Sequence, residues 1–504
     1  MNNGKIYASA ITGFIVAAAL LFASCYWNPQ SGTGSITLHI SGPASRSITA
    51  PTTVSYARVF LYTDNGDTPV NVGESTAFAE AALSGGSGSV TVQNVPAGPQ
   101  YKLVLVLGTK DTSSGVFLPA SYSQTQSAFA ITANKDNVVA LAAPQALQGT
   151  DSSGQPVPVQ YDLMGKNLTG ATIANGYWAA STSNTLFAAI GSGLVNTSYS
   201  TLTPGGTINS LSAASPDPAG YFSDEIWMNT TSGIVTFDPS NGQLPPVPTG
   251  GPSTSVLMSG SYAIATRTGE DAVFYADKDG LGGVVFGGQI NVPYWVTIPI
   301  TDVSVPPVLD FAFHVITTTG DTAYFATKLG AFAVGSDVLS VGNNTLAYLL
   351  NHAAFFSVVD PNGNNPFINS LTLDGFDTEL YVGTNNGIYT ATAADIDALV
   401  GAGSTPYRIT SAPLSNTQGH AFKKLVAGPT GYSPAYWVGW SGGSFFYGQI
   451  GGTSTTIVPV AAVSLGTPQA IAIMHDYYSS QYVFLMIAGS EGLSFVPLGY
   501  VAWG

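Results

Sequence analysis

The feature that most constrains this chain of 504 residues is a short hairpin pattern that recurs from about residue 186 to the end. Each copy has two apolar runs joined by a polar turn that contains glycine, as in "LYVGTNNGIYT" at residues 380–390. Alternating apolar residues around such a turn are typical of a β-hairpin. One turn glycine from each copy gives the series Gly193, Gly233, Gly280, Gly330, Gly387, Gly443 and Gly492.

The spacing of these glycines predicts the architecture. Successive glycines are 40, 47, 50, 57, 56 and 49 residues apart, which is comparable with a four-stranded propeller blade of about 40–50 residues. One blade cannot bury both of its faces, so the copies must stack and close into a ring. Seven copies predict a seven-bladed β-propeller over residues 156–504. Residues 156–163, "PVPVQYDL", are the candidate strand that closes the ring.

The rest of the chain also favours an all-β fold. Only 8% of the residues are charged, whereas 58 are glycine and 31 are proline, a composition poor in helix formers. Residues 35–143 contain short alternating runs separated by turns, which predict a small N-terminal β-sandwich. A Gly/Ser/Pro-rich segment at residues 144–155 is the expected linker. The net charge of −15 argues against nucleic-acid binding, because an acidic surface repels phosphates.

Two stretches resemble known families. The passage "GSVTVQNVPAGPQYKLVLVLG" is similar to the strand–VPAG–strand passage of immunoglobulin-like or transthyretin-like bacterial domains. The copy "LYVGTNNGIYT" resembles the repeat of two-component-regulator and other WD-like propellers. Both resemblances concern the fold and not the function. A propeller in particular serves many different functions.

The first 25 residues have the layout of a signal peptide. Lys5 precedes an uncharged, mainly apolar stretch at residues 6–24, which ends before Cys25, the only cysteine of the chain. The ending "FASC" resembles the lipobox of bacterial lipoproteins, of the looser spirochaete type because Phe22 replaces the usual leucine. The resemblance implies cleavage after residue 24 and a lipid on Cys25, with residues 25–34 as a tether. Two alternatives are an uncleaved transmembrane anchor, for which 19 residues suffice, and plain secretion.

The same resemblance implies where the protein is located. In bacterial lipoproteins an aspartate after the lipidated cysteine favours retention in the inner membrane, but this chain has Tyr26 there. We therefore expect an outer-membrane or cell-surface protein. Several acyl chains, such as palmitate, anchor a protein stably, because each buried methylene contributes roughly 0.8 kcal/mol.

Motifs of known enzymes are not matched. Residues 439–443, "GWSGG", have the form of a hydrolase elbow, but an aromatic strand follows instead of a helix, so we expect Ser441 in a hairpin turn. Sialidases, which are propeller enzymes, hold a carboxylate with three arginines, and residues 156–504 contain only Arg267 and Arg408. We predict no catalytic residue.

Metal and cofactor motifs are not matched either. The turns at residues 277–280 and 360–364, which gather Asp and Asn oxygens, do not have the glycine and the final acidic residue of an EF-hand loop. The five histidines are far apart in the sequence, without zinc-ligand spacing. Neither a P-loop nor a dinucleotide fingerprint occurs. We predict no metal site and no cofactor.

The two longest glycine spacings indicate where a partner binds. They leave room for long loops, and long loops on a rigid scaffold often carry binding surfaces. The first contains an Asn-rich turn, from which we predict a partner-binding loop with Asp360, Asn362, Asn364 and Asn365. The second contains "AADIDALV", which predicts one or two helical turns. The alternative is that both loops are merely slack connections.

These features favour a lipid-anchored protein of the cell envelope that binds or scaffolds a protein or glycan partner without catalysis. Two alternatives stay open. One is a glycan-degrading hydrolase or lyase whose carboxylates lie on loops that cannot be aligned. The other is an assembly factor for outer-membrane proteins.

Overall fold

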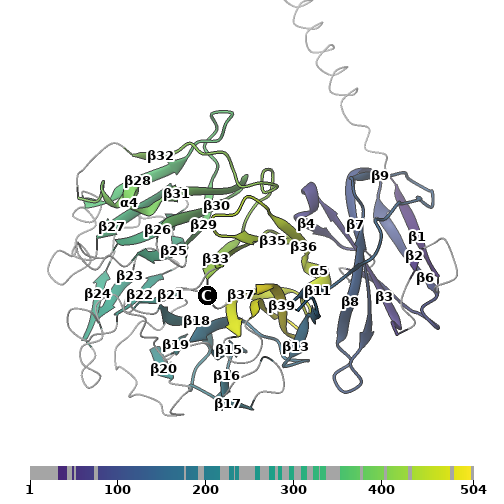
Figure 1. Ribbon diagram of the computed structural model, residues 1–504, viewed down its shortest axis with the longest axis horizontal. Helices are drawn as coiled ribbons and strands as arrows, with labels where there is room; N and C mark the ends of the chain where they lie inside the picture. The colour runs from purple at the N-terminus through teal and green to yellow at the C-terminus, as the bar shows by residue number, and fades with distance from the viewer. Residues whose placement is uncertain are drawn as a thin grey trace, which may run out of the picture. The chain divides into compact units, whose positions relative to one another are not determined.

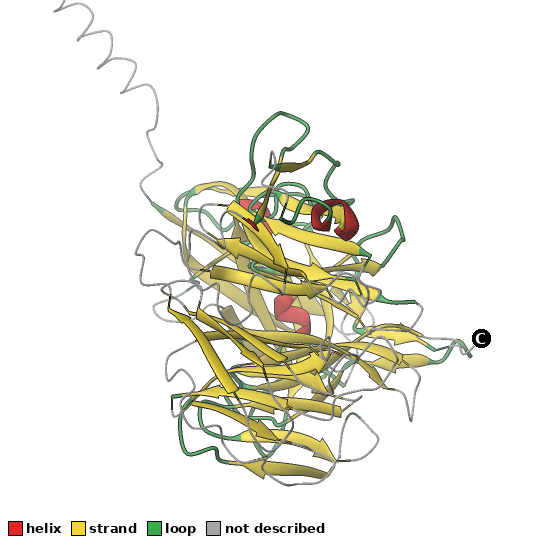
Figure 2. Ribbon diagram, turned by 90° about the vertical axis from the view of Figure 1, so that its left-hand side faces the viewer, coloured by secondary structure: helices red, strands yellow, loops and turns green. Residues whose placement is uncertain are grey.

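The computed structural model is nearly all β (Figure 2), with 60% of the described residues in strands and 4% in helices. Chain contacts divide it into two units, residues 1–107 with 123–144, and residues 108–122 with 145–504. Cys25, Gly193 and Gly280 lie outside the described residues. The structure describes residues 32–41, 48–49, 53–72, 78–151, 153–174, 177–190, 194, 198–215, 226–231, 233–237, 256–261, 272–277, 282–286, 294–299, 308–314, 322–327, 330–335, 352–374, 378–401, 406–428, 434–476 and 482–500.

The strands between residues 33 and 146 form two sheets around one apolar core. In β1 the side chains of Ile36, Leu38 and Ile40 are buried, because alternate residues of a strand point to the same face. They share a core with Val59 of β3 and Leu105 of β7. The first sheet has the order β2-β1-β6, with β1 (Thr33–Ser41), β2 (Ile48–Thr49) and β6 (Gly88–Pro96). The second contains β3 (Tyr56–Thr63), β4 (Thr68–Val70), β5 (Phe78–Ala82), β7 (Gly98–Lys110), β8 (Phe117–Gln124), β9 (Phe129–Ile131) and β10 (Gln145–Ala146), with the 3-10 helix η1 (Asp64–Gly66) between β3 and β4.

The second unit is a succession of mainly antiparallel sheets, in which β18 with β21 and β28 with β32 are parallel pairs. The expected linker at residues 144–155 contains β10 and β11 (Gln148–Thr150), and β11 pairs with β12 (Pro156–Pro158). The strands that follow are β13 (Gln160–Asp162), β14 (Gly170–Ala174), β15 (Tyr177–Ser181), β16 (Leu186–Ile190), β17 (Ser198–Leu202), β18 (Ile208–Ser215), β19 (Ile226–Thr230), β20 (Gly233–Phe237), β21 (Val256–Ser261), β22 (Ala272–Asp277), β23 (Gly282–Phe286), β24 (Tyr294–Pro299), β25 (Val308–His314), β26 (Thr322–Thr327) and β27 (Gly330–Gly335). After them come β28 (Ala354–Val358), β29 (Ile368–Leu373), β30 (Glu379–Thr384), β31 (Gly387–Thr392), β32 (Tyr407–Ile409), β33 (Lys424–Gly428), β34 (Tyr436–Trp440), β35 (Ser444–Gln449), β36 (Thr456–Pro459), β37 (Pro468–Asp476), β38 (Tyr482–Gly489) and β39 (Gly492–Tyr500), with the helices α4 (Ala393–Asp397) and α5 (Val460–Val463). Helix α4 confirms the helical turn expected in "AADIDALV".

The first strands of successive sheets in the second unit contact one another. β14, β18, β21, β25, β29, β33 and β37 are in contact in this order, and β37 also contacts β14. Figure 1 shows β18, β21, β25, β33 and β37 near a common centre, whereas β17, β20 and β24 lie further out. The sequence of contacts therefore returns to its starting point.

The beginning and the end of the second unit are joined by hydrogen bonds. β13 pairs antiparallel with β39, so that Gln160 lies opposite Phe495. Of the candidate closing segment at residues 156–163, Gln160–Asp162 thus pair with a C-terminal strand, whereas Pro156–Pro158 pair with β11. Next to it, the Tyr482 hydroxyl accepts a hydrogen bond from the Thr150 N–H (3.1 Å) and donates one to the Thr150 carbonyl oxygen (3.2 Å).

Three of the turn glycines have the same geometry. Gly330, Gly387 and Gly492 each begin the third strand of a run, with φ of +137°, +131° and +143°, values that L side chains rarely adopt. The first copy was assigned incorrectly: "LFAAI" is β16, the third strand of its sheet, whereas the other copies start on the second strand. The equivalent turn there is residues 182–185, which contains no glycine. The spacing of 40 residues between Gly193 and Gly233 therefore does not join equivalent turns of two sheets.

Candidate functional site

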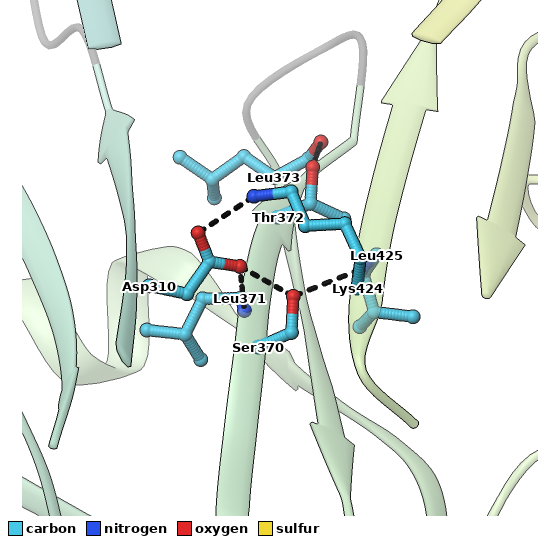
Figure 3. Close-up of polar contacts among 7 residues, drawn as sticks. All are labelled: Asp310, Ser370, Leu371, Thr372, Leu373, Lys424 and Leu425. Carbon is cyan, nitrogen blue, oxygen red and sulfur yellow. Dashed lines mark hydrogen bonds and ion pairs between the residues drawn. The ribbon is translucent and has the colours of Figure 1, made fainter. Parts of the chain in front are cut away.

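Three polar side chains from three consecutive sheets form the central polar cluster: Asp310 on β25, Ser370 on β29 and Lys424 on β33 (Figure 3). Lys424 Nζ lies 2.7 Å from Asp310 Oδ1. Asp310 Oδ2 accepts hydrogen bonds from the Ser370 hydroxyl and from the Leu371 N–H (3.1 Å). The Ser370 oxygen in turn accepts one from the Leu425 N–H (2.8 Å). The cluster thus links the first strands of all three sheets.

Strand register explains why these residues meet. In β29, Ile368 pairs with Thr384, and Ser370 pairs with Gly383. Two residues along β29 thus correspond to one residue along β30, which is the register shift of a β-bulge. β25 has the same shift between Val308 and Asp310. A bulge changes the direction in which a side chain points. Asp310 and Ser370 therefore occupy equivalent positions near the start of neighbouring first strands.

The burial of the central polar cluster is uneven. Asp310 is 4% exposed and Ser370 is fully buried, whereas the Lys424 side chain is 41% exposed. A buried carboxylate is costly unless it is paired and hydrogen-bonded, and Asp310 has at least three donors. The cluster holds one carboxylate, so it does not offer the pair of carboxylates that a glycosidase uses. Its chemical capacity is to fix three strands and to present an oriented ammonium group.

The structure gives Asp360 a role inside the predicted binding loop. Residues 360–365 connect β28 to β29, and Asp360 is 4% exposed. Its Oδ2 accepts a hydrogen bond from Asn364 Nδ2 (3.1 Å), and its Oδ1 accepts from the N–H groups of Asn364 (2.8 Å) and Asn362 (2.9 Å). These hydrogen bonds hold the pKa of Asp360 below its ordinary value, and the bond from the Asn364 side chain has the largest effect. Asp360 therefore shapes the loop, whereas Asn362, Asn364 and Asn365 are exposed.

This loop is tied to the neighbouring hairpin turn. Asn386 Nδ2 donates to Asp360 Oδ2 (3.4 Å), while Asn386 Oδ1 accepts from the Gly419 N–H (3.2 Å). The Asn385 side-chain oxygen accepts from the N–H of Phe367 (2.9 Å), a residue that is 37% exposed. Since β29 begins directly after the loop, the loop and the central polar cluster lie at the same end of the sheet formed by β29, β30 and β31.

Ser441 lies in a hairpin turn, as expected. It is between β34 and β35, is fully buried, and its N–H donates to the Ser444 carbonyl oxygen at 3.0 Å. Its hydroxyl donates to the same oxygen at 3.2 Å. The hydroxyl therefore closes the turn.

None of the sequence motifs considered above includes Asp310, Ser370 or Lys424 of the central polar cluster. One signal was present: "INSL" occurs twice, at residues 208–211 and 368–371. Aligning the two copies marks Ser210 and Ser370 as equivalent, and the β25 bulge adds Asp310.

In the part of the chain that the structure describes, no group of three His, Cys, Asp or Glu side chains is placed to hold a metal ion. None of the helices in these residues has the length and the apolar character needed to cross a membrane.

Comparisons with known proteins give little further information. No family model matches the chain, and the comparison with curated proteins found no match. Among solved structures, the chain is similar to PorZ of Porphyromonas gingivalis, described as an essential bacterial surface component of the type-IX secretion system, with 14% identity and a TM-score of 0.40. The alignment covers 69% of this chain and 39% of PorZ. A likeness at this level carries no argument about function.

Proposed function

We propose that this protein is a lipid-anchored component of the bacterial cell envelope, in which a seven-bladed β-propeller binds or scaffolds a protein or glycan partner without catalysis. The observation that carries the proposal is the cycle of contacts among seven first strands, from β14 to β37 and back to β14. A closed array of this kind leaves only short sheet edges, each protected by the neighbouring sheets. It also gives its connecting loops a rigid support.

The proposed binding surface lies at the end of the sheets that carries residues 360–365. It combines the exposed amides Asn362 and Asn365, the partly exposed ring of Phe367 and the ammonium group of Lys424. Amides and aromatic rings suit both peptide and sugar surfaces. Nucleic acid remains disfavoured by the net charge of −15.

The proposed anchor is the lipid on Cys25, which follows a signal peptide at residues 1–24 and precedes a tether at residues 25–34. A β-sandwich at residues 35–143 would serve as a spacer. Two sheets around one core support that part of the proposal. The proposed location is the outer membrane or the cell surface.

Crosslinking on intact cells, followed by mass spectrometry, tests the binding surface. We expect the triple variant Asn362→Ala, Asn365→Ala and Phe367→Ala to lose the partner captured by the natural protein, by about tenfold or more, because these side chains form the exposed part of the loop. The control is Thr453→Ala, an exposed residue in the turn between β35 and β36. If the triple variant captures the same partner equally well, the binding surface lies elsewhere.

A further inference from the structure

Asp162 lies on β13, the strand that joins the beginning of the second unit to its end. It is opposite Leu493 of β39, and Gln160 is opposite Phe495. Directly opposed residues of antiparallel strands point to the same face of a sheet. Asp162 therefore points to the face that carries Leu493 and Phe495, both fully buried in one core with Trp178 of β15. The Trp178 and Phe495 rings are 5.9 Å apart.

Only one of the two carboxylate oxygens of Asp162 has a hydrogen-bond partner there. Its Oδ1 accepts a hydrogen bond from the Leu163 N–H at 2.6 Å. Its Oδ2 is buried and has no hydrogen-bond partner. Burial of this oxygen disfavours the ionised form, so the pKa of Asp162 is raised above its ordinary value.

Charged side chains on the elements packed against this face are few. Strands β14, β15 and β16 carry no Asp, Glu, Lys, Arg or His, and their one titratable side chain is Tyr177. In the last sheet, His475 and Asp476 lie at the opposite end, where Asp476 pairs with Tyr482.

The remaining charged neighbours are in the adjoining turns. Lys166 follows β13 in the chain, and Glu491 precedes β39, with its carbonyl oxygen accepting from the Gly165 N–H at 2.8 Å. Tyr161 alternates to the other face, where its hydroxyl donates to the Pro119 carbonyl oxygen at 3.0 Å. The environment of the Asp162 carboxyl group is therefore mainly apolar.

We propose that Asp162 makes the pairing of β13 with β39 a pH-sensitive clasp, which is tighter in mild acid than at neutral pH. The ionised carboxylate is penalised in the folded state and is solvated in the unfolded state. Because the pKa is higher in the folded state, stability is lowered above the folded pKa. It rises as the pH falls through that value, and the gain is complete below the unfolded pKa.

Thermal melting of the full chain between pH 4 and pH 8 tests the clasp. We compare the natural protein with Asp162→Asn, which removes the charge and nearly keeps the shape. At pH 7.5 and above, the variant should melt higher, by on the order of 1–3 °C for a chain of this size. The difference should shrink as the pH falls, because the natural carboxyl group then becomes neutral as well.

Two further variants keep the test decisive. Asp162→Val also removes the charge and suits a strand, so the gap between its melting temperature and that of the natural protein should change with pH in the same way. Asp395→Asn replaces an exposed carboxylate on α4 and serves as the control. The difference between its melting temperature and that of the natural protein should not shrink as the pH falls. The proposal is overturned if the gaps for both Asp162 variants are independent of pH, or if they widen in acid.

Discussion

At the scale of single residues, Asp310 shows how a buried carboxylate is accommodated. It receives an ammonium group, a hydroxyl and a backbone N–H from two neighbouring sheets. We expect Asp310→Ala to destabilise the second unit by about 2–4 kcal/mol, because buried donors left without an acceptor cost about 1–3 kcal/mol each. Lys424→Met leaves this buried carboxylate without its cation, so it should also destabilise the unit, by about 1–3 kcal/mol once the exposure of the lysine is allowed for. Denaturant unfolding measures both changes, and the absence of a measurable cost for either variant would contradict the assignment.

At the scale of elements, the hairpin turn before β31 depends on its glycine. Gly387 has φ of +131°, and a Cβ there would lie 3.0 Å from the Cβ of Pro413. We expect Gly387→Ala to cost about 1–3 kcal/mol, because the new Cβ would press on Pro413 in a backbone conformation that is already strained for other residues. Gly363→Ala is the matched control, since φ there is also positive, at +82°, but the space around it is open. Thermal melting should show a clearly larger decrease for Gly387→Ala, and equal decreases would mean that the contact with Pro413 adds no cost.

At the scale of the whole molecule, the prediction concerns the attachment of the protein to the membrane. Cys25→Ser removes the only thiol that can carry a lipid. We expect an unprocessed precursor and complete loss of metabolic labelling with palmitate, as the lipobox resemblance implies. The variant Ser24→Ala keeps a small residue before Cys25 and should still be processed. Normal cleavage and labelling of Cys25→Ser would refute the lipid anchor.

Local features of the fold could be predicted from the sequence. The strand runs, the hairpin turn at Ser441 and the short helix α4 depend on residues that are neighbours in the chain. Alternation of apolar residues gives strands, and glycine gives the turns that other residues resist. The position of a copy within its sheet was less certain, because a hairpin of the second and third strands has the same local pattern as one of the third and fourth. For that reason the first copy was misplaced.

Contacts between distant residues were decided only by the tertiary structure. Lys424 and Asp310 are separated by 114 residues, and they meet because of the register of two bulged strands and a third sheet. The pairing of β32 with β28, rather than with β31, has the same origin. Asp360 looked like a surface residue of a polar loop, yet its carboxylate is turned inward to hold that loop. The sequence by itself determined which residues form strands and turns, whereas burial and long-range pairing decided what each polar side chain does, because both depend on which strands lie side by side.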